Sequence, residues 1–191
     1  MTLEGKKIGF AFTGAFGYYK KTIEEIKKLV KIRNISIIPI MSFNSYIINT
    51  RYGDSKEFIK ILEEITQNKV IHTINDAEKI GKILDIIIIA PCSGNTISKL
   101  ANDIIDTPVI ISVKQHLAEN KPVVIGIASK NALSDNAENI GKLLNRKNHY
   151  FVPFRQSNPI TKPNLILYNS KYIKNTLEEA LEQKQIQPII L

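Results

Sequence analysis

Cysteine, tryptophan and long apolar runs are scarce or missing in this sequence of 191 residues. The single cysteine excludes a disulfide framework and a cysteine-rich zinc site. The three histidines lie far apart without the spacing of metal ligands, so we expect no metal centre. The longest purely apolar run covers residues 86–90, whereas a membrane-spanning helix needs roughly 18 residues. Residues 1–7 lack the apolar core of a secretion signal, and we therefore expect a cytoplasmic protein with no membrane partner.

The charge and the apolar content are those of a folded domain. Apolar residues make up 43% of the chain and charged residues 23%, which is close to the globular average and excludes a disordered chain. The net charge is +8, but the lysines alternate with glutamates on predicted helix faces and form no arginine cluster, so we expect no nucleic-acid partner. A chain of this length fits one domain that buries about 70% of its extended surface, and we assign residues 1–191 to it.

Short isoleucine- and valine-rich runs alternate with helical patterns of period 3.6, which predicts an α/β fold with a parallel sheet. The run at 86–90 is apolar without alternation, as expected for a central strand covered on both faces. A polar stretch at 155–164 with two prolines predicts a loop. The expected strands are 8–13, 36–41, a short one near 70–74, 86–90, 123–128 and 150–154, and the expected helices are 18–31, 55–66, 95–104, 109–119, 135–145 and 171–184.

Several element boundaries follow from local signals. Asp54 is a candidate N-cap for the helix at 55–66, and Pro91 is expected to end the central strand. The helix at 95–104 is expected to bury Ile104 with its apolar stripe. Thr107 and Pro108 resemble an N-cap followed by proline at the first helical position, which favours a helix at 109–119, although residues 109–113 could also form a strand.

In an open parallel α/β sheet, ligands bind beyond the carboxyl ends of the strands, so the loops there are the candidate site. The first loop, Thr13 to Gly17, joins a strand to a helix whose free N–H groups suit a phosphate, although any tight turn of this kind can require two glycines. The second loop carries Ser42 where a dinucleotide-binding site would carry an acid, and no Gly-Lys-Ser/Thr follows the first loop. A ligand with one terminal phosphate therefore fits better than a dinucleotide or a nucleoside triphosphate.

The third loop contains Pro91, Cys92, Ser93, Gly94, Asn95 and Thr96, and it opens a helix. Its hydroxyl and amide groups exceed what one N-cap requires, although Ser93 or Asn95 could simply cap the helix. Cys92 has no base or cation near it in the sequence, so we do not expect it to be a nucleophile.

Together, Thr13 to Gly17, Ser42 and the segment from Pro91 to Asn102 resemble the FMN-binding flavoprotein family, which includes the homo-oligomeric cysteine decarboxylases and the flavin prenyltransferases. The resemblance covers nearly the whole length. It implies a flavodoxin-like or Rossmann-like three-layer αβα fold, FMN as the cofactor, and a homo-oligomer with FMN at the contacts of trimers or larger assemblies.

The resemblance also implies roles for individual residues. The backbone N–H groups of Gly14, Ala15 and Phe16 would bind the FMN phosphate together with Ser42. Pro91 to Thr96 would line the flavin ring, with Ser93 and Asn95 hydrogen-bonded to its polar edge.

Within the family, the chain is most similar to a branch that works with a separate dehydrogenase-like protein, the A component of dipicolinate synthase, to convert a dihydrodipicolinate-type dicarboxylate to dipicolinate for spores. Residues 42–51 lack the histidine base of the decarboxylases, and the decarboxylase motif Pro-x-Met-Asn is reduced to Asn131. Arg51 and Lys130 suit the recognition of substrate carboxylates beside Asn131. No acid or base is assigned. The alternatives are an FMN-dependent decarboxylase or prenyltransferase acting alone, and a non-catalytic scaffold.

Overall fold

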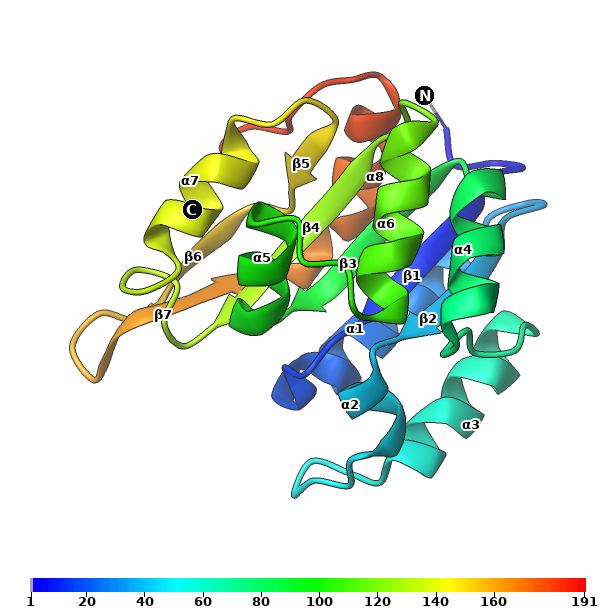
Figure 1. Ribbon diagram of the computed structural model, residues 1–191, viewed down its shortest axis with the longest axis horizontal. Helices are drawn as coiled ribbons and strands as arrows, with labels where there is room; N and C mark the ends of the chain where they lie inside the picture. Colours follow the sequence, from blue (N-terminus) through cyan, green and yellow to red (C-terminus); the bar gives the residue numbers. More distant parts are fainter. Residues whose placement is uncertain (1) are drawn as a thin grey trace.

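A computed structural model describes residues 2–191 as a mostly parallel seven-stranded sheet with helices on both faces, a three-layer αβα arrangement (Figure 1). This confirms the predicted fold class. The strands lie in the order β2-β1-β3-β4-β7-β6, and β5 also pairs with β4. The strands are β1 (Lys7–Phe12), β2 (Ser36–Met41), β3 (Ile86–Cys92), β4 (Val123–Ser129), β5 (His149–Phe151), β6 (Phe154–Asn158) and β7 (Lys162–Tyr168). The helices are α1 (Tyr19–Leu29), α2 (Phe43–Ile47), α3 (Ser55–Thr66), α4 (Ile74–Ile83), α5 (Gly94–Ala101), α6 (Pro108–Ala118), α7 (Ala137–Leu144) and α8 (Ile173–Leu181), with 3₁₀ turns η1 (Phe16–Tyr18) and η2 (Ser170–Tyr172).

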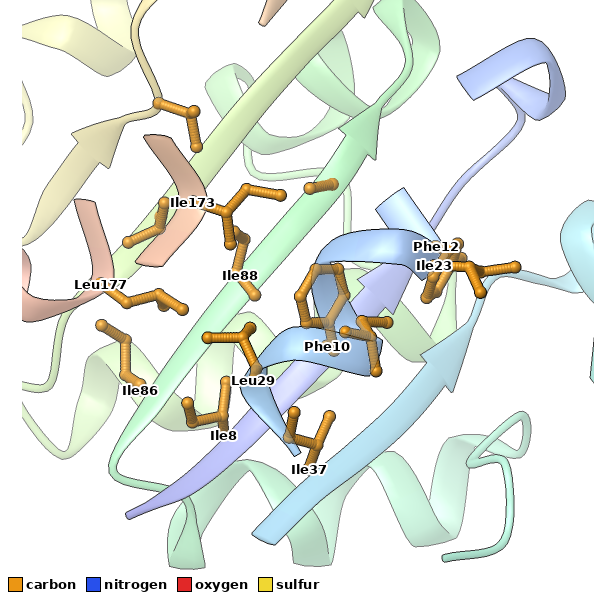
Figure 2. Close-up of a cluster of buried hydrophobic side chains, with 14 of the residues drawn as sticks. Ile8, Phe10, Phe12, Ile23, Leu29, Ile37, Ile86, Ile88, Ile173 and Leu177 are labelled. Carbon is orange, nitrogen blue, oxygen red and sulfur yellow. The ribbon is translucent and has the colours of Figure 1, made fainter. Parts of the chain in front are cut away.

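The central strand β3 divides its side chains between two apolar cores. Ile86 and Ile88 point to the face covered by α1, α3 and α8, and Figure 2 shows them beside Leu177 of α8 and Ile8 of β1. Ile87 and Ile89 point to the face covered by α5, α6 and α7. Because helices cover both faces of the strand and exclude water, apolar residues are needed at every position. This explains why apolar and polar residues do not alternate along the strand.

The edge of β4 is shared by two partners. Its first half pairs with β5 in parallel, and its second half, at Ala128 and Ser129, pairs with β7 in antiparallel register. Strand β6 then pairs with β7 to form a hairpin. The hairpin therefore lies beside the carboxyl end of β4, the edge at which the candidate loops were expected.

Local signals placed several elements correctly. Strand β2 and helix α3 have the predicted bounds, and the hydroxyl of Thr107 accepts a hydrogen bond from the Ile110 N–H as the N-cap of α6. Residues 109–113 are thus helical, and the alternative of a strand is wrong. Asp54 occupies the N-cap position of α3, but its side chain makes no capping bond. The side-chain oxygen of Asn49 accepts the Ser55 N–H at 3.0 Å instead.

Two expectations for the central segment are wrong. Pro91 does not end β3, because the strand continues to Cys92 through an irregular register in which the missing proline N–H is tolerated. Ile104 is not part of the apolar stripe, since it is 47% exposed. Helix α5 ends at Ala101, and Asp103 adopts a left-handed conformation with φ of 55° that turns the chain away.

Helix α4 is absent from the sequence-based assignment, and the short strand expected near 70–74 is a single bridge between Ile40 and Ile71. The buried face of α4 is made of Ala77 and Gly81. A Cβ atom at Gly81 would lie 2.4 Å from the backbone oxygen of Ser112 in α6. The two helices pack backbone to backbone, so α4 lacks the large apolar stripe that would have revealed it.

The strand expected at 150–154 is confirmed only in part, because the chain leaves the strand after residue 151, and the loop expected at 155–164 is wrong. Residues 149–151 form β5, and residues 154–168 form the β6–β7 hairpin. Pro153 separates the two strands because it cannot donate to a ladder. Most hairpin side chains are exposed, which accounts for the polar composition that suggested a loop. The final helix is shorter than predicted, and no helix within residues 2–191 has the length and apolarity to cross a bilayer.

Candidate functional site

The three predicted loops meet at one cavity of about 360 Å³ at the carboxyl edge of the sheet. Gly14 lines it from the first loop, Ser42 from the second, and Ser93, Asn95 and Thr96 from the third. A larger hollow of about 640 Å³ lies between α1 and the β6–β7 hairpin, but none of the predicted site residues lines it. The convergence of loops that are distant in sequence makes the smaller cavity the candidate site.

The buried hydroxyl of Thr13 ties the first loop to the third. It donates a hydrogen bond to the Pro91 carbonyl at 2.8 Å and accepts one from the Ser93 N–H at 2.8 Å. Its hydrogen-bonding capacity is therefore used within the protein. The backbone N–H groups of Gly14 and Phe16 have no acceptor within residues 2–191, and a Cβ atom at Gly14 would meet no atom within 4 Å. The first loop thus offers open backbone donors rather than a side chain.

The second loop also has backbone N–H groups that a ligand could use. The Ser42 hydroxyl accepts the Ser45 N–H at 3.3 Å and lies 2.8 Å from the Ser45 hydroxyl. Because Ser45 donates its own hydrogen to the Phe12 carbonyl, the hydrogen of Ser42 must point to Ser45. Ser42 is thus engaged as the N-cap of α2, which leaves the N–H groups of Phe43 and Asn44 without acceptors in the described chain.

The third loop divides between the core and the cavity. Pro91 and Cys92 are buried and do not line the cavity, so the expectation that the whole segment faces one ligand is wrong for these two. Burial raises the pKa of the Cys92 thiol, which agrees with an inert packing residue. The Ser93 hydroxyl lies 3.1 Å from that of Thr96. The exposed Asn95 side chain has no partner within residues 2–191, so its amide is free for a ligand.

Gly94 faces a polar cluster behind the cavity and does not line it. The Asn131 side-chain oxygen accepts the Ser129 hydroxyl at 2.7 Å and the Asn136 amide at 3.0 Å. A Cβ atom at Gly94 would lie 2.6 Å from that oxygen, so the cluster packs directly against the start of α5. Asn131 was predicted to contact substrate. Its oxygen has both its bonds inside the fold, and its amide nitrogen donates to Asp135 at 3.4 Å, so Asn131 packs behind α5 and its contact with substrate stays a prediction.

The cations predicted to bind substrate lie outside the cavity. Arg51 lines a separate hollow of about 590 Å³ beside α1 and α3, and it donates a hydrogen bond to the Tyr52 hydroxyl at 2.8 Å. Lys130 is exposed just after β4. Neither residue contacts the cavity that the three loops form.

The starts of three helices border the cavity. Ser42, Ser93 and Thr107 are the N-cap residues of α2, α5 and α6, and all three line it. Helix N-termini carry partial positive charge and unpaired N–H groups, so this arrangement favours an anion. Lys99 and Asp106 also line the cavity and pair at 2.6 Å. The sequence showed Thr107 only as a helix cap, and it contained no signal for the Lys99–Asp106 pair.

The histidines have structural surroundings. The His116 ring nitrogens each lie 3.1 Å from a carbonyl, of Gly81 and of Pro122, and burial lowers the pKa of His116 to about 4. His72 stacks on Tyr46 with ring centroids 3.7 Å apart. Within residues 2–191, no group of three histidine, cysteine or acidic side chains is placed to hold a metal ion.

Comparisons with known proteins identify the family of the chain. The family described as Flavoprotein matches residues 1–172. The chain is 38% identical over 192 aligned residues to the B component of dipicolinate synthase from Bacillus subtilis, covering 100% of the chain and 96% of the relative. The crystal structure of the corresponding B component from Bacillus halodurans matches with a TM-score of 0.91 and 35% identity, covering 100% of this chain and 98% of that one. The FMN-dependent cysteine decarboxylase SpaF shares the fold at 17% identity and a TM-score of 0.67, over 94% of this chain and 99% of that one.

Proposed function

The chain belongs to the flavoprotein family, and we propose that it is the FMN-binding component of a dipicolinate-forming enzyme. The observation that carries this proposal is the cavity at the carboxyl edge of the sheet, where three helices begin and three loops meet. An FMN phosphate is a dianion, and the open N–H groups around the cavity are the donors that such a group requires.

The residues present fit FMN. The backbone N–H groups of Gly14 and Phe16, with those of Phe43 and Asn44, would hold the phosphate, and Gly14 leaves room for it because no side chain fills that space. Ala15 contributes only to the shape of the loop, since its N–H donates to the Thr13 carbonyl at 2.6 Å.

The flavin ring would lie against the third loop. Ser93, Asn95 and Thr96 face the cavity with hydroxyl and amide groups, and the Asn95 amide is free to donate to and accept from the polar edge of a ring. When bound, FMN supplies the capacity to take up or deliver a pair of electrons. The chain would position the cofactor and keep it at the edge of the sheet.

We infer the reaction from the relatives. Full-length similarity to the B component of dipicolinate synthase supports a role in which this chain works with the A component to oxidise a dihydrodipicolinate-type dicarboxylate to dipicolinate. The same similarity supports the mother-cell cytoplasm of a spore-forming organism as its location. A homo-oligomer as the working state is supported by a structural neighbour, an FMN-dependent Ubix-like decarboxylase described as dodecameric. An FMN-dependent decarboxylase or prenyltransferase acting alone has less support, because residues 42–51 contain no histidine base.

A non-catalytic scaffold for the A component is the second candidate. Lys99 and Asp106 are the only charged side chains of the described residues that line the cavity, and they pair with each other at 2.6 Å. Ser42 is engaged in capping α2. The cavity wall in the described chain therefore presents no acid or base that lacks a partner, which is consistent with a binding role without chemistry.

The visible spectrum of the purified chain mixed with FMN separates these candidates. We expect a bound flavin spectrum and binding of riboflavin about 100-fold weaker, because riboflavin lacks the phosphate that makes charge-assisted hydrogen bonds. Equal binding of the two flavins would contradict the phosphate site, and no binding of either would favour the scaffold. Assays of precursor oxidation with each of the two components alone and with both together would then test the division of labour.

A further inference from the structure

A group of cations surrounds the Tyr52 hydroxyl outside the FMN cavity. The Arg51 guanidinium donates to this hydroxyl at 2.8 Å and lies 5.0 Å from the centre of the Tyr52 ring. The hydrogen bond and charge of Arg51, together with the charges of Lys130 and Lys162, lower the pKa of the Tyr52 phenol. Three segments that are distant in sequence thus bring positive charge to one hydroxyl.

These cations have no acidic partners. Arg51, Lys130 and Lys162 are all exposed, and none forms an ion pair with a carboxylate within residues 2–191. Five exposed lysines elsewhere pair with a glutamate three or four positions away on the same helix, as Lys27 does with Glu24. All three charges act on the region of the Tyr52 hydroxyl, so an anion bound there would be attracted by each of them without displacing a carboxylate.

The group adjoins two of the loops that form the FMN cavity. The Tyr52 ring lies against the first loop, since a Cβ atom at Gly17 would be 3.2 Å from the ring carbon that bears the hydroxyl. Lys130 directly follows Ser129, whose hydroxyl packs against Gly94 at the start of α5. The backbone bond from the Leu133 N–H to the Asn164 carbonyl, 3.3 Å long, holds the turn after β4 beside β7, which begins at Lys162. The cations therefore adjoin two of the loops that form the cavity, while none of the three lines the cavity itself.

We propose that Arg51, Lys130 and Lys162 form a subsite for the carboxylates of a small dicarboxylate, and that Tyr52 is a positioning residue that holds the Arg51 guanidinium in place. This inference rests on the proposed function for the nature of the substrate, and it adds Lys162 and Tyr52 to the residues that select it. A guanidinium fixed by a neighbouring hydroxyl can form two parallel hydrogen bonds to one carboxylate, while the lysines supply charge for the other.

Calorimetric titration with pyridine-2,6-dicarboxylate, with and without FMN, tests the subsite. We expect Arg51→Ala and Lys162→Ala each to weaken binding about tenfold, the factor that corresponds to 1.4 kcal/mol. Lys147→Ala is the matched control, because it removes one exposed lysine just before the start of β5. Lys147 lies at the amino ends of the parallel strands, whereas the subsite lies at their carboxyl ends, so this variant should leave binding unchanged. Pyridine-2-carboxylate, with one carboxylate, should bind more weakly than the dicarboxylate.

Tyr52 needs two variants, because a positioning role must be separated from simple packing. Tyr52→Phe keeps the ring but removes the hydroxyl that Arg51 contacts, and we expect it to weaken dicarboxylate binding nearly as much as Tyr52→Ala while the FMN affinity stays unchanged. Full binding by Tyr52→Phe would exclude the positioning role.

The outcomes for the subsite and for the FMN site are distinct. Dicarboxylate binding that survives both Arg51→Ala and Lys162→Ala, or that is matched by inorganic phosphate at equal concentration, would overturn the subsite while FMN binding stands. Absence of FMN binding with the variant effects intact would overturn the proposed function but keep the anion subsite. If the wild-type chain binds no dicarboxylate and the same variants instead weaken its association with the A component, the cations serve an acidic protein surface and the inference is wrong.

Discussion

Replacing Gly94 by alanine should destabilise the fold at the site without touching the wall of the cavity. The added Cβ atom would lie 2.6 Å from the Asn131 side-chain oxygen, 2.6 Å from the Ser129 hydroxyl and 2.8 Å from the Asn136 amide. All three distances are shorter than real Cβ contacts. The Ser129 hydroxyl and the Asn136 amide both donate hydrogen bonds to the Asn131 oxygen, so these atoms cannot move apart freely. The cluster therefore has to break or α5 has to move.

The expected cost follows from these contacts. Overpacking costs about 1–3 kcal/mol, and one lost hydrogen bond in the cluster adds about 1 kcal/mol. Alanine recovers up to about 1 kcal/mol through its higher helix propensity. The net loss is about 2 kcal/mol, which lowers the melting temperature of a domain this size by about 4–8 °C.

Thermal unfolding of two glycine variants measures this effect. Gly141→Ala is the matched control, because Gly141 also lies within a helix, α7, and a Cβ atom there meets nothing within 4 Å. That variant should gain about 0.5–1 kcal/mol. The double variant of Gly94→Ala with Asn131→Ala should lose less than the sum of the two single changes, because the close contact with the Asn131 oxygen is gone and the Ser129 and Asn136 side chains no longer share a fixed acceptor. If Gly94→Ala had the same melting temperature as Gly141→Ala, the close packing of this cluster against α5 would be refuted.

Three further predictions concern the cavity and the core. Gly14→Ala should leave the melting temperature unchanged, because its Cβ atom meets nothing, yet weaken FMN binding about tenfold or more by occupying the phosphate space, as measured by fluorescence titration. Asp106→Asn should strengthen FMN binding, because it removes the one negative side chain in the described cavity wall and frees the Lys99 charge; an unchanged affinity would place the phosphate elsewhere. Burial lowers the pKa of His116 to about 4, so the folded state holds the neutral ring, and its contribution to stability is complete above pH 6.5 and is lost as the pH falls towards 4. The free energy of unfolding of the wild type, measured in urea, should fall over this range by up to about 3 kcal/mol. His116→Gln should make the free energy of unfolding less dependent on pH.

The parts of the fold that follow from the sequence are those with a strong local signal. The unbroken isoleucines of β3 and the Thr107–Pro108 start of α6 are set by burial on both faces and by capping, which act over a few residues. The carboxyl-edge rule then brought Gly14, Ser42 and Asn95 together correctly, because parallel strands end at the same edge.

The errors arise where the contact partner is distant in sequence. Helix α4 packs through Gly81 against the α6 backbone, and small residues leave no apolar stripe in the pattern. The bonds from Ser129 and Asn136 to the Asn131 oxygen could not be predicted, because nothing in the local sequence shows that these residues meet. Residues 155–164 were predicted as a loop because their side chains are exposed, although they belong to a hairpin that pairs with β4 through Ile166 and Leu167.

The cavity is built largely from backbone groups, and this explains why its chemistry is hard to assign from side chains. Thr13 uses its hydroxyl to join the first and third loops, and Ser42 uses its hydroxyl to start α2. Both side chains make hydrogen bonds within the protein that fix the shape of the site before any ligand binds. Less conformational entropy is therefore lost on binding. The donors left over are N–H groups, which every non-proline residue supplies. The informative sequence signals at such a site are therefore its glycine, Gly14, and its helix caps.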